Sequence, residues 1–321
     1  MTRRTFTMRT KFLVGTLFSL VAFAPTAAFA TDKLPAALPA SQVASQVASS
    51  LSITKIPKSL ATPLSSMSTD HIDRYYPTIK IGCYNYNAAC TFGNATAKKS
   101  LVLLGDSHAA MWAPAIIPTA TAAGYKVVVL WYPNCPAADV TPFLVLRGAL
   151  DPKCATWHHR IFGDIAKAKP SVVVLSEATS FAQSASATPF TLSEWQTGLE
   201  KTITAVGGAS TKVVMLSDIP LFNESPSNCL ARNPAAVQQC GAALVSSDPS
   251  LRQLTAAESA AALSKHAKFV SFTSLLCASS CSPIVGNHVT YFDSNHVASS
   301  YAATIRTPLW TQLTKAITSA N

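Results

Sequence analysis

Five short apolar segments, rich in Val and Leu, recur between residues 98 and 271, and they constrain the fold more than any other feature. Each spans four to six residues, which suits a strand and is too short for a typical helix. Because the segments are apolar throughout rather than alternating, they predict strands buried on both faces. The candidate strands are Ser100–Leu104, Lys126–Trp131, Ser171–Ser176, Lys212–Ser217 and Lys268–Ser271.

Stretches with helical character separate these strands. They lie near residues 108–123, 155–168, 193–206 and 250–266, and a last one follows His296 to about residue 318. Alternating strands and helices predict a parallel sheet covered by helices on both faces, which is a doubly wound α/β domain. About 220 residues is a normal size for one such domain.

Eight cysteines fall into four couples that are close in sequence, and six of them lie in or beside the long loops 132–154, 218–249 and 272–295. An even number of cysteines behind an export signal indicates disulfides, although sequence alone allows 105 pairings of eight cysteines. Zinc is the alternative, but no Cys-x-x-Cys occurs and no His follows at finger-like spacing. Proximity predicts the loop-closing pairs Cys83–Cys90, Cys135–Cys154, Cys229–Cys240 and Cys277–Cys281.

The N-terminal part of the chain differs in composition from the rest. Residues 1–30 resemble a secretory signal, with a basic start, an apolar run and small residues before a cleavage point, and the alternative is an uncleaved membrane anchor. Residues 31–80, rich in Ala, Ser, Pro and Thr, predict a linker or a loosely packed extension. Residues 81–321 are then the folded domain.

The charge pattern excludes one class of partner. Removal of the four basic residues within 1–30 lowers the formal net charge from +10 to +6, and the remaining basic residues are scattered. Nucleic-acid-binding proteins concentrate basic residues to neutralise phosphates, so a nucleic acid is not expected as a partner.

The stretch LVLLGDSHAAMW places three polar residues where the first predicted strand ends and a helix begins. Ligands of open α/β sheets bind at the carboxyl ends of strands, and a helix N-terminus favours negative charge. Ser107 therefore suits a nucleophile, provided that a base takes its proton. The alternative is that Ser107 or Asp106 merely caps the helix.

A candidate base lies near the C-terminus, in YFDSNHVASSYAA. Asp293 and His296 are three residues apart, which lets the carboxylate accept from one ring nitrogen while the other faces a serine. Ser107, His296 and Asp293 are the predicted triad. The alternative is that the Asp–His pair forms only a surface hydrogen bond.

These two motifs resemble those of the SGNH hydrolases of the GDS(L) esterase type, with most similarity to the SGNH domain fused behind membrane acyltransferases of the acyltransferase type 3 family. The similarity runs from about Cys83 to the end of the chain and includes NCPAADV and LSDIP. The resemblance implies a flavodoxin-like three-layer α/β/α sandwich with a parallel central sheet. It also implies that Ser107 is the nucleophile, His296 the base and Asp293 its orienting acid. The backbone N–H of Ser107 would be one oxyanion donor.

The chain departs from this family pattern in three respects. It has no long series of apolar membrane segments, so a separate membrane acyltransferase is an expected partner. The family's oxyanion Gly and Asn are not evident, and Asn134 is a candidate replacement, unless it only shapes the turn before Cys135. His108 stands where the consensus has Leu, and we expect it to pack against Asp106 rather than to line the pocket.

Two further residues near the site have open alternatives. Trp112 is a candidate for the substrate pocket, although an apolar aromatic residue on a helix is more often part of the core. Glu177 follows a strand end and is a candidate for substrate contact, although we expect it to be an exposed, solvated carboxylate.

The resemblance implies an exported serine esterase or O-acyltransferase that acts on O-acyl groups, often acetyl, of cell-envelope carbohydrate. No metal or cofactor is expected, and the protein is expected to be a monomer in the periplasm or cell wall. One alternative is a catalytically weak or inactive SGNH-fold module that binds glycan. Another is a lipase-like enzyme for long acyl chains.

Overall fold

The computed structural model describes residues 32–79, 83–144, 148–181 and 190–320. The predicted signal at 1–30 lies outside these ranges. Within them, none of the helices combines the length and the apolar character that a membrane span requires.

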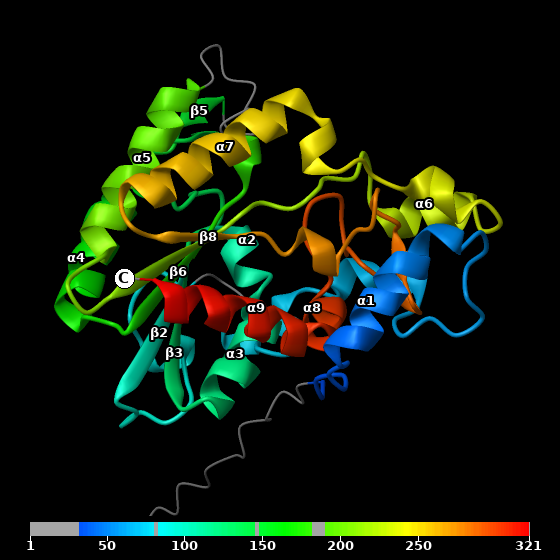
Figure 1. The fold of residues 1–321 in the computed structure, drawn as a ribbon, viewed down its shortest axis with the longest axis horizontal. Helices are drawn as coiled ribbons and strands as arrows, with labels where there is room; N and C mark the ends of the chain where they lie inside the picture. The colour runs from blue at the N-terminus through cyan, green and yellow to red at the C-terminus, as the bar shows by residue number, and fades with distance from the viewer. Residues whose placement is uncertain (1–31, 80–82, 145–147, 182–189, 321) are drawn as a thin grey trace, which may run out of the picture. The chain divides into compact units, whose positions relative to one another are not determined.

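A six-stranded sheet with the order β1-β3-β2-β6-β7-β8 forms the centre of the domain (Figure 1). All neighbouring strands pair in parallel except β1, which pairs with β3 in the antiparallel sense. The strands are β1 (Thr91–Phe92), β2 (Lys99–Gly105), β3 (Tyr125–Trp131), β6 (Val172–Ser176), β7 (Lys212–Leu216) and β8 (Lys268–Val270). The five predicted strands are thus confirmed to within one residue at each end.

Alternating residues of each strand face opposite layers. Leu101 and Leu103 of β2 belong to one buried cluster with α3, α8 and α9, whereas Val102 and Leu104 belong to another with α4, α5 and α7. Figure 1 shows these two groups of helices on opposite sides of the sheet. The helices are α1 (Ala40–Ser49), α2 (Ser107–Ala110), α3 (Ala113–Ala122), α4 (Pro152–Ala168), α5 (Leu192–Val206), α6 (Pro226–Arg232), α7 (Pro249–Ser264), α8 (Ser299–Thr304) and α9 (Arg306–Ser319). The three-layer α/β/α sandwich with its parallel sheet is therefore confirmed.

Two predicted helices are each divided in the structure. The stretch expected near 108–123 forms α2 and α3, and Pro114 lies in the first turn of α3, where its missing N–H costs nothing. The C-terminal stretch likewise divides into α8 and α9 at Ile305. Two small antiparallel pairs that sequence did not predict lie in loops: β4 (Phe143–Leu144) with β5 (Ala149–Leu150), and β9 (Ile284–Val285) with β10 (His288–Val289).

Four disulfides close local loops. They join Cys83 to Cys90, Cys135 to Cys154, Cys229 to Cys240 and Cys277 to Cys281, with sequence separations of 7, 19, 11 and 4 residues. These are the four pairs that sequence proximity predicted. They restrict long connections that otherwise lose much entropy on folding.

The N-terminal segment 32–79 is integral to the domain rather than a linker. Val43 and Val47 of α1 lie one helical turn apart and are buried in the same cluster as α8 and α9. Backbone N–H groups of Leu38 and Ala61 donate to the carbonyls of Thr304 and Asn287, at 2.9 and 2.8 Å. The expectation of loose packing overlooked the apolar residues spread along this segment, of which Val43, Val47, Met67, Ile72 and Ile79 are buried in the cluster.

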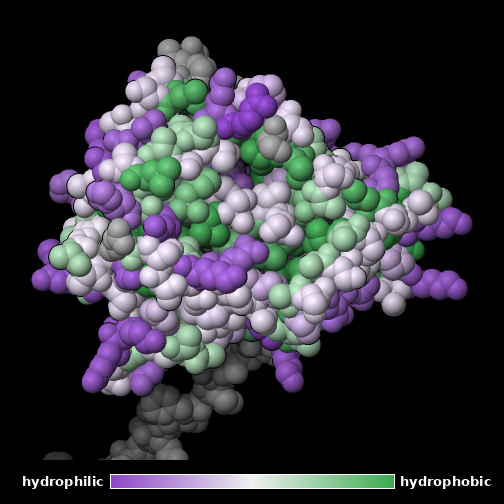
Figure 2. All heavy atoms as spheres, viewed as in Figure 1, coloured by the Kyte–Doolittle hydropathy of each residue, from purple (hydrophilic) through white to green (hydrophobic). Residues whose placement is uncertain are grey.

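One surface of the domain combines polar and apolar areas. On the face in Figure 2, hydrophilic side chains lie mainly around the edge, and less polar residues fill much of the middle. This distribution agrees with the scattered charges of the sequence.

Candidate active site

The turn after β2 sets the position of the candidate nucleophile. A Cβ atom at Gly105 would lie 1.8 Å from the carbonyl oxygen of Ser176, so only glycine allows β2 and β6 to approach here. The chain then enters α2 directly, with Ser107 as its first residue. Because β2 lies where the strand order reverses direction, Ser107 is at the edge where ligands of doubly wound folds bind.

Asp106, not Ser107, caps this helix. Its carboxylate accepts from the N–H groups of His108 and Ala178 at 2.8 and 2.9 Å, which ties α2 to the segment after β6. Burial raises the pKa of Asp106 to about 6. The capping alternative is thus correct for Asp106, and the hydroxyl of Ser107 remains available for another contact.

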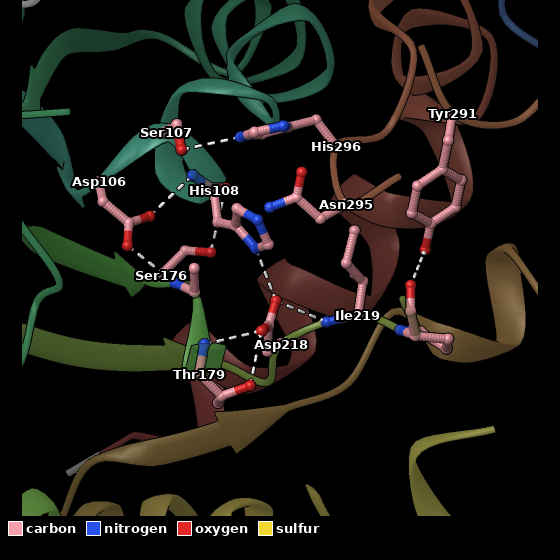
Figure 3. A network of polar contacts seen from close by, with 12 residues as sticks. Asp106, Ser107, His108, Ser176, Thr179, Asp218, Ile219, Tyr291, Asn295 and His296 are labelled. Carbon is pink, nitrogen blue, oxygen red and sulfur yellow. Dashed lines mark hydrogen bonds and ion pairs between the residues drawn. The ribbon is translucent and has the colours of Figure 1, made fainter. Parts of the chain in front are cut away.

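The structure brings the three predicted triad residues together. His296 Nε2 lies 2.8 Å from Ser107 Oγ (Figure 3), and His296 Nδ1 lies 2.8 Å from Asp293 Oδ2. The other carboxylate oxygen of Asp293 accepts from the N–H groups of Asn295 and His296, at 2.9 and 2.8 Å. Asp293 is therefore held by its own turn and in turn fixes the ring of His296, with Nε2 directed at the serine.

The charge state of Asp293 suits this arrangement. Partial burial alone would raise its pKa, but the hydrogen bonds from His296 and the turn N–H groups hold it below its ordinary value. An ionised Asp293 favours the tautomer of His296 that carries its proton on Nδ1 and leaves Nε2 as the acceptor. His296 Nε2 is thus placed to accept a proton from Ser107 Oγ.

A second His–Asp pair lies buried beside the triad. His108 Nδ1 lies 2.6 Å from Asp218 Oδ1, and the ring of His108 meets that of His296 edge-on at 4.9 Å between centroids (Figure 3). Burial would lower the pKa of His108, but the facing Asp218 raises it above its ordinary value. Packing was expected, yet the partner is the Asp218 side chain rather than that of Asp106. Sequence signalled Asp218 only as a polar residue after a strand.

A pocket of about 330 Å³ opens over the triad. Its lining contains the three triad residues together with His71, Ile72, Asp73, Ala110, Met111, Trp131, Phe292 and Ser299. Trp131 ends β3 and Phe292 precedes Asp293, so one lies at the end of a predicted strand and the other beside a predicted triad residue. Neither residue was predicted to line the pocket. Apolar side chains and polar groups both line the pocket, a combination typical of small-molecule sites.

Trp112 and Asn134 lie elsewhere in the described part of the chain. Trp112 is fully buried and packs edge-on against Phe272 at 5.4 Å, which agrees with the core alternative. Asn134 is exposed, has a φ of 60° and occupies the turn that leads to Cys135. Neither residue lines the pocket, so the structure does not bring these two pocket candidates to Ser107.

Glu177 corrects a further expectation, because its carboxylate is fully buried rather than solvated. One of its oxygens accepts from the N–H of Ala138 at 2.7 Å, and burial raises its pKa well above the ordinary value. The strand end that carries Glu177 lies against the segment around Ala138, which sequence could not show.

The possible metal ligands near this loop are already engaged. Cys135, Cys154 and His158 lie within ligand distance of one another, but the two sulfurs form a disulfide. His158 instead approaches the Pro136 carbonyl at 2.9 Å. Cys135 and Cys154 therefore form the disulfide that sequence proximity predicted.

Comparisons with known proteins agree with this fold. A family model described as "SGNH domain (fused to AT3 domains)" matches residues 75–311. The periplasmic domain of the lipopolysaccharide acetyltransferase from Salmonella ser. Paratyphi A is similar in structure, with a TM-score of 0.56 and 17% identity over 76% of this chain and 97% of that one. The TM-score shows that the two domains share a fold.

Two esterases are more distant in structure. They are a carbohydrate acetylesterase from Sinorhizobium meliloti, with 12% identity and a TM-score of 0.43 over 68% of this chain and 99% of that one, and the M. smegmatis aryl esterase, with 14% identity and the same TM-score and coverage. A search of curated protein sequences finds no match.

Proposed function

The chain belongs to the family of SGNH domains of the type fused to AT3 domains, and from that premise we propose that it is a serine esterase or O-acyltransferase acting on O-acyl groups, acetyl above all, of cell-envelope carbohydrate. One observation carries the proposal. An unbroken chain of hydrogen bonds joins Asp293, His296 and Ser107 at the floor of an open pocket.

The proposed reaction begins at Ser107. His296 takes the hydroxyl proton on Nε2 while Oγ attacks the acyl carbonyl, and Asp293 stabilises the imidazolium. The tetrahedral intermediate collapses when His296 returns the proton to the leaving sugar oxygen, which leaves an acyl-serine. Water or another sugar hydroxyl then gives its proton to His296 while its oxygen attacks the acyl-serine. The bond to Ser107 Oγ breaks, His296 returns the proton to Oγ, and the free acid or the acylated sugar leaves.

The backbone N–H of Ser107, at the start of α2, is the proposed donor to the oxyanion. No second donor was identified among the predicted residues, because Asn134 lies outside the pocket lining in the described ranges. This observation favours the glycan-binding module as the second candidate function, since losing one donor costs about 10²–10³ in rate.

An extracytoplasmic location is part of the proposal. Four disulfides are stable only where thiols are oxidised, as in the periplasm or outside the cell. The similar Salmonella domain is itself described as periplasmic. For acyl transfer, we expect a membrane acyltransferase to supply the acyl group to this domain.

A fluorophosphonate probe tests the proposal, because it labels only an activated serine. Oxidised wild type should gain one adduct in intact mass, and Ser107→Ala and His296→Ala should gain none. His159→Ala, on the exposed face of α4, is the matched control and should be labelled like wild type. If folded wild type is not labelled, the proposal of a serine enzyme is wrong and the glycan-binding module becomes the proposed function. A series of esters of increasing acyl length then separates an acetyl-directed enzyme from a lipase-like one.

A further inference from the structure

One wall of the active-site pocket comes from the N-terminal segment rather than from the α/β core. His71, Ile72 and Asp73 line the same cavity as Ser107 and His296. Sequence had placed these residues in a linker or loose extension, and the proposed reaction assigns them no role. Two polar side chains, His71 and Asp73, thus reach the pocket from a segment that is distant in sequence from the rest of its lining.

The segment is fixed firmly at this point. Asp70 is fully buried, and its carboxylate accepts from the backbone N–H of Ser300 at 3.1 Å and from the Ser300 hydroxyl. Its carbonyl also accepts from the N–H of Ser299 at 2.9 Å. Since Ser299 begins α8, three residues after His296, the segment and the loop that carries His296 are held to the same helix end.

His71 and Asp73 themselves form an ion pair at the pocket. The ring of His71 packs against Phe292 at 5.8 Å, and Phe292 stacks on His296 at 5.3 Å with 12° between the ring planes. The ion pair and the aromatic contact together orient His71 on the wall of the cavity. The pocket thus contains two His–Asp pairs, one at the nucleophile and one from the N-terminal segment.

Other polar groups in the lining are unsatisfied. Among the residues that the structure describes, the indole N–H of Trp131 and the hydroxyl of Ser299 are buried and have no hydrogen-bond partner. Unpaired buried polar groups are costly unless a ligand satisfies them. Imidazole, carboxylate, indole N–H and hydroxyl groups are of the kinds that bind a polyhydroxylated ring.

We infer that His71 and Asp73 form the hydroxyl-recognising wall of this pocket and determine its preference for O-acylated sugars over esters without hydroxyls. This inference rests on the proposed function, because it concerns substrate choice at the same serine. His71 and Asp73 act as specificity-determining residues that contact sugar hydroxyls, while Ser107 and His296 perform the acyl chemistry.

Two esters matched in shape test this inference. In 6-O-acetylglucose the acetyl group is on a primary carbon next to a six-membered ring with hydroxyls, and cyclohexylmethyl acetate has the same arrangement without them. The measured quantity is the ratio of kcat/KM for the two esters. We expect wild type to favour the sugar ester, and His71→Ala and Asp73→Asn each to reduce that ratio about ten- to hundredfold.

Further variants separate recognition from a structural effect. His71→Gln keeps a hydrogen-bonding side chain and should recover part of the ratio, and exposed His159→Ala should leave it unchanged. Asp73→Asn keeps its volume, so it maintains the test if His71→Ala does not fold. If both rates fall equally, the wall only supports Phe292 and His296, and the inference is wrong.

The remaining outcomes are also decisive. A wild type that hydrolyses both esters equally well recognises no hydroxyls, which overturns the inference and leaves the esterase intact. A folded wild type that neither reacts with the fluorophosphonate nor hydrolyses either ester overturns the proposed function first.

Discussion

Replacing Asp218 with Asn should destabilise the protein strongly, because Asp218 is the buried partner of His108. Its carboxylate accepts four hydrogen bonds, from His108 Nδ1 at 2.6 Å and, each at 2.8 Å, from the N–H and hydroxyl of Thr179 and the N–H of Ile219. The side chains of His108 and Asp218 are only 1% and 4% exposed. Because both side chains are buried, water cannot replace the hydrogen bonds that Asp218→Asn removes.

The magnitude follows from these contacts. An Asn side chain has one acceptor oxygen, so its NH₂ group must face a donor, and at least one buried N–H loses its acceptor. That loss costs about 1–3 kcal/mol, and removal of one partner from a buried ion pair costs about 3–5 kcal/mol in all. We expect Asp218→Asn to lower the free energy of unfolding by about 3–5 kcal/mol, out of a typical ~5–15 kcal/mol for a domain.

Urea unfolding of the oxidised protein, followed by tryptophan fluorescence, measures this loss. A double-mutant cycle with His108→Gln should give a coupling energy of about 2 kcal/mol or more, because the two side chains share one buried interaction. Additive effects within about 0.5 kcal/mol, or a loss under about 1 kcal/mol for Asp218→Asn alone, would refute the reasoning.

The pH dependence provides a second check on the same pair. The folded-state pKa of His108 lies above its ordinary 6.5, so this stabilisation is complete below pH 6.5 and is lost as the pH rises through the higher value. The folded-state pKa of Asp218 lies below its ordinary 3.8, despite burial, so its contribution is complete above pH 3.8 and is lost at lower pH. The stability difference between wild type and Asp218→Asn should be largest between these two values and smaller at alkaline pH.

Three further substitutions test other parts of the structure. Asp293→Asn should lower kcat on an aryl acetate by about 10³–10⁴-fold through loss of the correct His296 tautomer, while circular dichroism shows an unchanged fold; a loss under tenfold would contradict the orienting role. Burial raises the folded-state pKa of Glu177 well above 4.5, so its contribution to stability is lost as the pH rises from 4.5 towards the folded-state value. Because Gln cannot titrate, Glu177→Gln should lose less free energy of unfolding than wild type between pH 5 and pH 8, as measured by urea unfolding. Equal losses would count against a buried acid. The double variant Cys135→Ala/Cys154→Ala should lower the free energy of unfolding by about 3 kcal/mol, since a disulfide spanning 19 residues constrains the unfolded chain; an unchanged urea midpoint would contradict this.

The strands were predictable because each is buried on both faces and carries its signal within a few residues. Val172–Ser176 reads as a strand without knowledge of its neighbours, and so do the other four parallel strands. The two-residue β1 has no such signal, because its pairing with β3 depends on where the Cys83–Cys90 loop lies. The helix divisions at Met111–Trp112 and at Ile305 likewise depend on how each half packs.

The candidate site was predictable where its parts adjoin recognisable motifs. Ser107 follows a predicted strand, and Asp293 and His296 are three residues apart, a spacing typical of a hydrogen-bonded Asp–His pair. The sequence therefore indicated each part separately, and the fold places the two parts side by side. Asp218 and His71 carry no comparable local pattern. Their roles arise from the strand order, which places the end of β7 beside His108, and from the packing of segment 32–79 against α8.

The most direct test of the central claim is to detect the acyl-enzyme itself. Protein would be incubated with 6-O-acetylglucose, quenched in acid within one turnover, and digested for peptide mass mapping. We expect one acetyl group on the peptide that contains Ser107 in wild type, and none there in Ser107→Ala or His296→Ala. Continued ester turnover in Ser107→Ala, or turnover by wild type without acetylation of Ser107, would contradict a nucleophilic serine at this site.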